Sequence, residues 1–182
     1  MAGPPPLVVL DRDGVINEDS EHFIRSVDEW RPIPGSLEGI ALLHRAGVRV
    51  AVVTNQSGVG RGLYGEDALA AIHARMIAEV EGAGGALAGI YYCPHRPDEG
   101  CECRKPKPGL LRRLERELGL PVAGAPFIGD RLTDVEAARA VGARPVLVRT
   151  GVGAQTALAL APEVEVYADL RAAARAILGL PS

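Results

Sequence analysis

Leu7-Val8-Val9-Leu10-Asp11-Arg12-Asp13-Gly14 is the stretch of sequence that decides the fold of this chain. Its four apolar residues are typical of a strand buried on both faces of a parallel sheet, and they end abruptly at two carboxylates. Ligands of open α/β sheets bind outside the carboxyl ends of the strands. We therefore expect this strand to carry Asp11 to the mouth of a sheet, with Gly14 allowing a tight turn beyond it.

Strands and helices are expected to alternate along the rest of the chain. Apolar and turn patterns predict further strands over 48–53, 90–92, 126–128 and 145–148. Helices are predicted from Ser36 to a stop at Gly47, and over 66–81, 108–118, 134–141 and 168–178. Residues 15–34 show no clear period and are expected to form a loop over the strand ends. This alternation indicates an α/β fold in one domain, 1–182: a Rossmann-like three-layer sandwich with a central parallel sheet, helices on both faces and no large cap domain.

Composition and charge exclude several classes of protein. The chain has 182 residues, 47% of them hydrophobic, and a net charge of −3. These values are typical of a globular protein and give no overall positive field for nucleic acid or membrane. No apolar run approaches membrane-spanning length, and the N-terminal stretch lacks the basic and apolar regions of a signal peptide. We expect a cytoplasmic monomer without nucleic-acid or membrane partners.

Asp11 and Asp13 could perform three kinds of chemistry. Their oxygens could bind Mg²⁺. One carboxylate could attack phosphorus and form an aspartyl-phosphate, and the other could donate a proton to the leaving oxygen. A solvated turn is the plain alternative, because Asp is common in turns.

Polar clusters at four predicted strand ends favour the catalytic interpretation. They are Asp11/Asp13, Thr54-Asn55, Arg104-Lys105 and Asp130/Asp134. The carboxyl ends of parallel strands meet at one edge of a sheet, so the clusters are expected to gather there. Asp130 can then add an oxygen ligand for Mg²⁺, Thr54 can hold phosphoryl oxygens, and Lys105 can neutralise charge on the nucleophile and the phosphoryl group.

All three cysteines of the chain lie between residues 93 and 103, beside a histidine. Cys93, His95, Cys101 and Cys103 supply the donor set of a closed tetrahedral zinc site. A disulfide is the alternative, but it would leave one thiol unpaired, and the expected cytoplasm is reducing. Four protein ligands leave no open position, so this zinc is expected to be structural and to hold the loop that carries Arg104 and Lys105.

These motifs resemble those of a known superfamily. Asp11-x-Asp13-Gly14, Thr54, Lys105 and Gly129-Asp130-x-x-x-Asp134 resemble the four motifs of haloacid dehalogenase phosphatases. Within that superfamily, residues 11–17, 54–58, 91–95 and 103–106 are similar to the D-glycero-D-manno-heptose 1,7-bisphosphate 7-phosphatases. That family removes the 7-phosphate and supplies heptose 1-phosphate for ADP-heptose and lipopolysaccharide biosynthesis. The related histidinol-phosphate phosphatases share much of the pattern.

The resemblance implies a role for each matching residue. Asp11 would be the nucleophile and Asp13 the acid/base, while Thr54 and Lys105 would stabilise the phosphoryl group. Mg²⁺ would be bound by Asp11, the Asp13 backbone carbonyl and Asp130. The residues implied in binding the phosphorylated sugar are Arg12, Asp19, His22, Asn55, Gln56, Ser57, Arg104 and Arg131.

Alternatives to a sugar-phosphate phosphatase stay open. Histidinol phosphate would keep the chemistry and change the substrate. A signalling receiver also holds a phosphoryl group with acids, a Thr and a Lys, but it would place its acceptor Asp after a later strand. A zinc-stabilised nucleic-acid binder is disfavoured by the negative charge and by the lack of aromatic residues among the basic ones.

Three other residues that stand out are assigned no chemistry. His44 and His73 lie on predicted helices, where exposure or packing is favoured over catalysis. Trp30 is expected to pack within the 15–34 loop.

Overall fold

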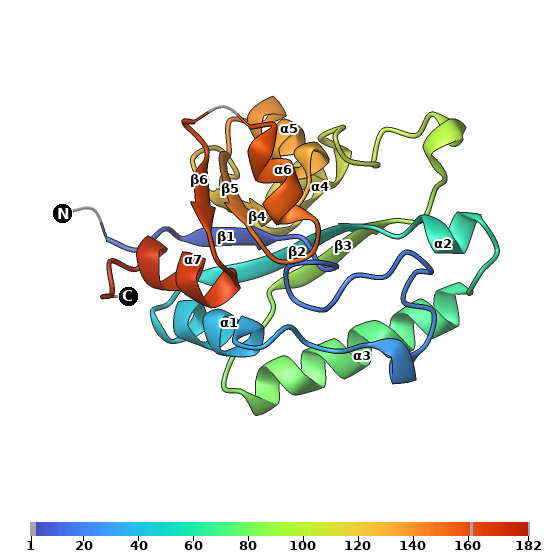
Figure 1. The fold of residues 1–182 in the computed structure, drawn as a ribbon, viewed down its shortest axis with the longest axis horizontal. Coiled ribbons are helices and arrows are strands. Elements are labelled where there is room, and N and C mark those ends of the chain that lie inside the picture. Colours follow the sequence, from blue (N-terminus) through green and yellow to red (C-terminus); the bar gives the residue numbers. More distant parts are fainter. Residues whose placement is uncertain (1–2, 161, 182) are drawn as a thin grey trace.

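The computed structural model describes residues 3–160 and 162–181, shown in Figure 1. Within them, parallel strands form one six-stranded sheet in the order β3-β2-β1-β4-β5-β6. The strands are β1 (Leu7–Leu10), β2 (Arg49–Asn55), β3 (Gly89–Cys93), β4 (Pro126–Gly129), β5 (Arg144–Val148) and β6 (Glu165–Tyr167). This order confirms the predicted α/β class. It also puts β1 in the middle, at the point where the strand order reverses and where such sheets bind ligands.

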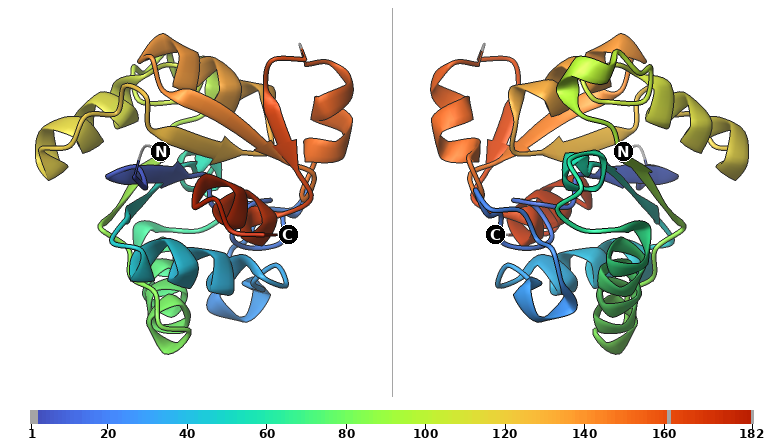
Figure 2. Two further views of the ribbon diagram at one scale, coloured as in Figure 1. Left: turned by 90° about the vertical axis from the view of Figure 1, so that its left-hand side faces the viewer. Right: turned by 90° about the vertical axis from the view of Figure 1, so that its right-hand side faces the viewer.

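Helices cover both faces of the sheet, as Figures 1 and 2 show. One face carries α1 (Ser36–Arg45), α3 (Glu66–Gly82) and α7 (Leu170–Ile177). The other carries α4 (Gly109–Leu118), α5 (Leu132–Ala140) and α6 (Gly153–Leu158). The short α2 (Ser57–Gly60) and the 3-10 turns Val27–Glu29 and Pro97–Glu99 belong to the connections. The predicted three-layer sandwich is therefore confirmed.

The four residues of β1 explain why its sequence is apolar without interruption. Val8 and Leu10 pack with α1, α3 and α7, while Leu7 and Val9 pack with α4 and α5. Successive side chains of a strand point to opposite faces, so a strand covered on both sides needs apolar residues at every position. Each buried side chain of this size contributes roughly 1.5–3 kcal/mol to the free energy of unfolding.

Three short elements were not predicted: α2 with four residues, α6 with six, and β6, a three-residue edge strand. Helix α5 begins at Leu132 rather than at Asp134. The reason is that the Asp134 carboxylate reaches back to accept a hydrogen bond from the backbone N–H of Arg131 (3.0 Å), which caps a helix that has already started.

The 15–34 loop is held firmly against the α1–α3–α7 side of the core. Ile16 and Trp30 are buried there, and Trp30 is only 2% exposed, which confirms its predicted packing role. The Ser36 hydroxyl at the start of α1 donates to the carbonyl oxygen of Ile16 (2.7 Å). His44 is exposed, as predicted. In the part of the chain that the structure describes, no helix combines the length and apolar character needed to cross a membrane.

Candidate active site

A cavity of about 350 Å³ opens at the carboxyl ends of the central strands. Its walls come from the 15–34 loop, the ends of β1 and β2, the loop after β3 and the start of α5. The predicted site residues that line it are Asp11, Asp13, Asp19, Asn55, Gln56, Ser57, Arg104, Lys105 and Arg131. The structure thus brings together the strand-end clusters that are far apart in the sequence.

Lys105 lies at the floor of this cavity, where it is 3% exposed. Its ammonium group lies 2.9 Å from Asp11 Oδ1 and 2.7 Å from Asp134 Oδ1, and it donates to the Val53 carbonyl (2.8 Å). Burial lowers the pKa of Lys105, but the two carboxylates outweigh this effect and raise it above the ordinary value. The lysine therefore stays charged, and each of its three N–H donors has a partner.

The backbone of Lys105 is fixed by the end of β2. Asn55 Nδ2 donates to the Lys105 carbonyl (3.1 Å), and the Lys105 N–H donates to Asn55 Oδ1 (3.0 Å). Next to this clamp, Gln56 Nε2 donates to Thr54 Oγ1 (2.9 Å), and Thr54 is buried behind the cavity wall. Asn55 thus fixes the backbone at Lys105 and also lines the cavity.

Three carboxylates cluster beside the lysine, and their combined negative charge exceeds its single positive charge. Oxygens of Asp11, Asp130 and Asp134 lie within 4.8 Å of one another. Burial raises the pKa of Asp11 well above its usual range, against the lowering effect of Lys105. Burial also raises the pKa of Asp130 to about 7. Carboxylates packed this closely away from water need additional positive charge in order to ionise.

The donor set of this cluster fits a hard divalent cation. Asp130 is fully buried, and its Oδ1 has no hydrogen-bond partner among the described residues. Its Oδ2 accepts a hydrogen bond from the Val152 N–H (3.0 Å). A buried carboxylate oxygen without a donor is costly unless it binds an ion, and carboxylate oxygens are the ligands that Mg²⁺ prefers.

Two glycines leave the space that the Asp130 carboxylate occupies. Gly14 has φ +82° and Gly151 has φ +59°, a region that favours glycine. A Cβ would lie 2.3 Å from Asp130 Oδ2 at Gly14, and 2.2 Å from the same oxygen at Gly151. The Thr150 hydroxyl, which donates to the Gly14 carbonyl (2.7 Å), ties the two turns together. Sequence reasoning missed this loop, although Gly151 and Gly153 follow a predicted strand end.

Asp13 is held by donors on both of its oxygens. Arg12 Nε (3.1 Å), Arg12 Nη2 (2.8 Å) and Asn17 Nδ2 (2.9 Å) donate to Oδ1. Gln56 Nε2 donates to Oδ2 (2.8 Å). Burial raises the pKa of Asp13, but the Arg12 charge and these hydrogen bonds reverse the effect and lower it overall. Oδ1 is therefore saturated, while Oδ2 keeps capacity on the side of the cavity.

Basic side chains form the outer wall. Arg131 Nη2 donates to Asp19 Oδ2 (2.5 Å) across the cavity mouth. Arg104 Nη1 is buried without a hydrogen-bond partner among the described residues. A cation that faces a cavity in this way can receive an anionic group of a ligand.

Two predicted substrate-binding residues do not reach the cavity. The Arg12 side chain is 0% exposed, because its guanidinium lies beneath the site and pairs with Asp13, so the expectation that it touches substrate is corrected. His22 is exposed and lines a neighbouring hollow formed by the 15–34 loop. His22 is absent from the lining of the site cavity, and its implied role in binding the substrate stays a prediction.

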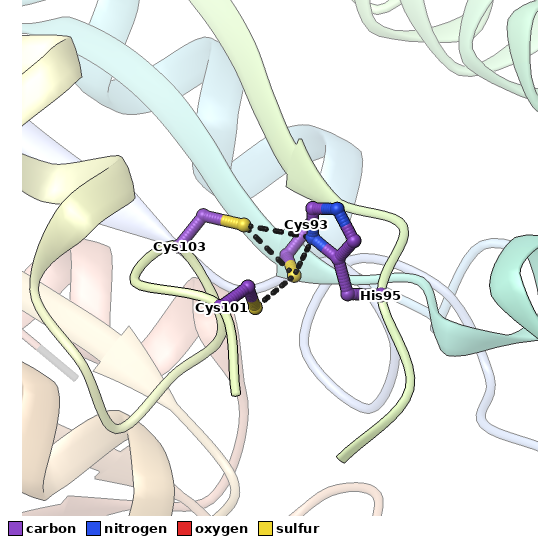
Figure 3. Close-up of side chains that lie close together, drawn as sticks. All are labelled: Cys93, His95, Cys101 and Cys103. Carbon is purple, nitrogen blue, oxygen red and sulfur yellow. Dashed lines mark hydrogen bonds between the residues drawn. The ribbon is translucent and has the colours of Figure 1, made fainter. Parts of the chain in front are cut away.

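The end of β3 and the loop after it carry a second group of metal-ligating atoms, shown in Figure 3. The Cys93 sulfur lies 3.1 Å from that of Cys103 and 3.6 Å from that of Cys101, and His95 Nδ1 lies 3.2 Å from the Cys103 sulfur. All four ligand atoms lie within 4.8 Å of one another, and the three thiols are free. Three sulfurs and one nitrogen converging on a point fit tetrahedral zinc.

Comparisons with known proteins agree with this geometry. A family model described as HAD-hydrolase-like matches residues 102–173. The D-glycero-β-D-manno-heptose-1,7-bisphosphate 7-phosphatase of Pseudomonas aeruginosa is 52% identical over 173 residues, 94% of this chain and 97% of that protein. The protein of the same name from Bordetella bronchiseptica is 47% identical over 174 residues, 94% of this chain and 97% of that protein. A crystal structure of D,D-heptose 1,7-bisphosphate phosphatase from B. bronchiseptica, complexed with magnesium and phosphate, superposes with a TM-score of 0.92 at 45% identity, over 95% of this chain and 98% of that one.

Proposed function

The chain belongs to the D-glycero-β-D-manno-heptose-1,7-bisphosphate 7-phosphatases, a family of haloacid dehalogenase-like phosphatases, and from this premise we propose that it hydrolyses the 7-phosphate of that sugar to give heptose 1-phosphate. One observation carries the mechanism. Asp11 Oδ1 lies 2.9 Å from the Lys105 ammonium at the floor of a cavity that Asp13 also lines. A nucleophile, a proton carrier and a fixed positive charge thus share one space.

The reaction proceeds in two displacements at phosphorus. An Asp11 carboxylate oxygen attacks the 7-phosphate, the bond between phosphorus and the sugar oxygen breaks, and Asp13 donates a proton to that oxygen. Asp13 then takes a proton from water, whose oxygen attacks the phosphorus of the aspartyl-phosphate; the bond between phosphorus and the Asp11 oxygen breaks, which regenerates the carboxylate and releases inorganic phosphate. Because Oδ1 of Asp13 is saturated by three donors, Oδ2 is the oxygen that exchanges the proton.

Lys105 stabilises the transferred group, and Thr54, which is buried and accepts from Gln56 Nε2, contributes through that amide. The ammonium, which is itself buried, opposes the charge that builds up on phosphoryl oxygens in the transition state. Asp11, Asp130 and the backbone carbonyl of Asp13 would hold Mg²⁺, which when bound offsets the repulsion between Asp11 and the anionic phosphate. Asn55, Gln56 and Ser57, together with the basic wall and Asp19, are the proposed contacts of the sugar.

The basic wall supports a substrate with a second phosphate. Arg104 Nη1 is buried with no hydrogen-bond partner in the described part of the chain, and Arg131 donates to Asp19 at the mouth. A planar guanidinium binds a phosphate through paired hydrogen bonds. A bisphosphate could therefore place one phosphate on Asp11 and the other against this wall.

Phosphorus NMR of the reaction tests the assignment. With heptose 1,7-bisphosphate and Mg²⁺, we expect the resonance of the 7-phosphate to be replaced by that of inorganic phosphate while the 1-phosphate persists. A parallel assay with histidinol phosphate should give a much smaller kcat/KM. Preferred hydrolysis of histidinol phosphate, or loss of the 1-phosphate first, would contradict the proposed substrate.

Gly151→Ala should weaken Mg²⁺ binding. The new Cβ would meet Asp130 Oδ2, so the carboxylate must leave its position, and disturbing a residue that orients a metal ligand costs about 10- to 100-fold in metal affinity. The measurement is the Mg²⁺ concentration that gives half-maximal activity. Gly119→Ala is the matched control, because Gly119 has a similar φ of +64° with nothing within 4 Å of the added Cβ. Equal Mg²⁺ requirements in both variants would argue against this role.

We also propose that the Cys93–Cys103 loop binds a structural zinc ion. Metal analysis should find one zinc per chain, and Cys101→Ser should lose it. Activity with saturating Mg²⁺ should then fall about tenfold or more, because the loop positions Lys105 and Arg104. Full turnover in a sample shown to be free of zinc would remove this proposal.

The oligomeric state, the cellular location and the partner of the enzyme are part of the proposal. We propose that the chain acts as a monomer with one catalytic domain over 1–182. Three thiols that serve as zinc ligands must stay reduced, which supports a cytoplasmic location. The partner is a small phosphorylated sugar.

A further inference from the structure

Arg12 is a fully buried cation, and each of its three side-chain nitrogens has a partner. Two of its nitrogens donate to Asp13 Oδ1, as described above. The third, Nη1, lies 3.2 Å from Nε2 of His73 on α3. A guanidinium only donates hydrogen bonds, so Nε2 must accept, and the ring is neutral with its proton on Nδ1.

His73 is well placed to hold this guanidinium. It is 8% exposed, and its ring packs near that of Tyr92, with 5.8 Å between centroids. The Tyr92 hydroxyl is held in turn by Glu66 at the start of α3 (2.5 Å). Burial, together with the Arg12 charge, lowers the pKa of His73 to about 4, which agrees with a neutral ring. His73 does not line the cavity, so it has no path to the substrate.

A second chain of hydrogen bonds, from Tyr64 through Gln56, reaches the Oδ2 atom of Asp13. The Tyr64 hydroxyl donates to Gln56 Oε1 (2.8 Å), which turns the amide so that Nε2 faces Asp13 Oδ2. The absence of a side chain at Gly58 leaves room for the Tyr64 ring, since a Cβ there would lie 2.2 Å from Tyr64 Cε1. Asp13 is thus held on two sides, by Arg12 with His73 behind it and by Gln56 with Tyr64 behind it.

We propose that His73 is a positioning residue for the reaction: by accepting from Arg12 Nη1, it fixes the guanidinium that orients the Asp13 carboxylate toward the cavity. This inference rests on the proposed role of Asp13 as the proton carrier. Without His73, a buried N–H of Arg12 would have no acceptor, and the guanidinium would turn to find one. Asp13 Oδ1 would lose its two Arg12 donors and keep only Asn17 Nδ2, while Gln56, held by Tyr64, would still donate to Oδ2.

Steady-state kinetics of His73 variants with heptose 1,7-bisphosphate test the inference. His73→Leu removes the acceptor at similar volume, and we expect kcat to fall about 10- to 100-fold, which is a part of the roughly 10²- to 10⁴-fold that proton transfer by a positioned side chain contributes. KM should change less than about twofold, because His73 makes no substrate contact. His73→Gln, which places an amide oxygen near the Nε2 position, should recover most of kcat. If His73→Leu does not fold, His73→Asn replaces it, since its shorter amide cannot reach Arg12.

The Asp13→Asn background separates this inference from the proposed function. If His73 acts through Asp13, adding His73→Leu to Asp13→Asn should cost less than about twofold in the single-turnover rate. A full additional loss in that background, no rescue by His73→Gln, or an unchanged kcat in His73→Leu would overturn the inference. If Asp13→Asn itself turns over at the wild-type rate, the proposed role of Asp13 fails instead.

Discussion

Asp11→Asn is expected to abolish phosphate release, lowering kcat by on the order of 10⁴-fold or more while the fold is kept. The amide has nearly the shape of the carboxylate but cannot attack phosphorus to form the acyl-phosphate. The change also removes one negative charge from a cluster whose carboxylates exceed the charge of Lys105, so stability should be retained or improved. The measurements are phosphate release with heptose 1,7-bisphosphate and the midpoint of thermal unfolding.

Asp67→Asn serves as the control for this variant. Asp67 is an exposed residue in the first turn of α3, so the same chemical change there should leave kcat unchanged. Preparations must first be shown to be free of deamidated or contaminating wild-type enzyme. Substantial activity in Asp11→Asn would then mean that another residue is the nucleophile.

Lys105→Met is expected to cost both activity and stability. Removing one partner of a buried ion pair typically destabilises a protein by about 3–5 kcal/mol, because the remaining charge stays buried without compensation. Here the ammonium serves both Asp11 and Asp134. The transferred phosphoryl group would also lose its fixed counter-charge, and kcat should fall by about 10²- to 10³-fold. Urea unfolding and steady-state kinetics measure the two effects.

Lys107→Met is a matched control, because Lys105 and Lys107 are the two lysines of the chain. Lys107 is exposed and pairs with Glu102 at the surface (2.8 Å). Exposed ion pairs contribute about 0–1 kcal/mol, so this variant should behave almost like wild type. Equal losses in the two variants would mean that the burial of Lys105 has no special role.

The architecture could be predicted from the sequence because its signals are local. The run from Leu7 to Leu10 is apolar at every position, which is what a strand covered on both faces requires. Once parallel strands are assumed, their carboxyl ends must share an edge, and this rule brings Asp11, Asp130 and Lys105 together. The cysteine loop was predictable for the same kind of reason, since its ligands are near neighbours in sequence.

Features that depend on tertiary packing could not be predicted. An arginine is expected at the surface, and nothing in Asp11-Arg12-Asp13 shows that α3 will supply His73 to receive a buried guanidinium. β6 pairs with β5 along only three residues, too few for a pattern. The contact between Gly151 and Asp130 joins two strand ends that sequence analysis treats separately.

Trapping the covalent intermediate tests the central claim most directly. Wild-type enzyme is mixed with heptose 1,7-bisphosphate and Mg²⁺, quenched within milliseconds, and reduced with borohydride, which converts an acyl-phosphate to an alcohol. Peptide mass spectrometry should then find homoserine at position 11, and none in Asp11→Asn. Reduction at another carboxylate, or none at position 11 while phosphate is released in a burst, would contradict the account.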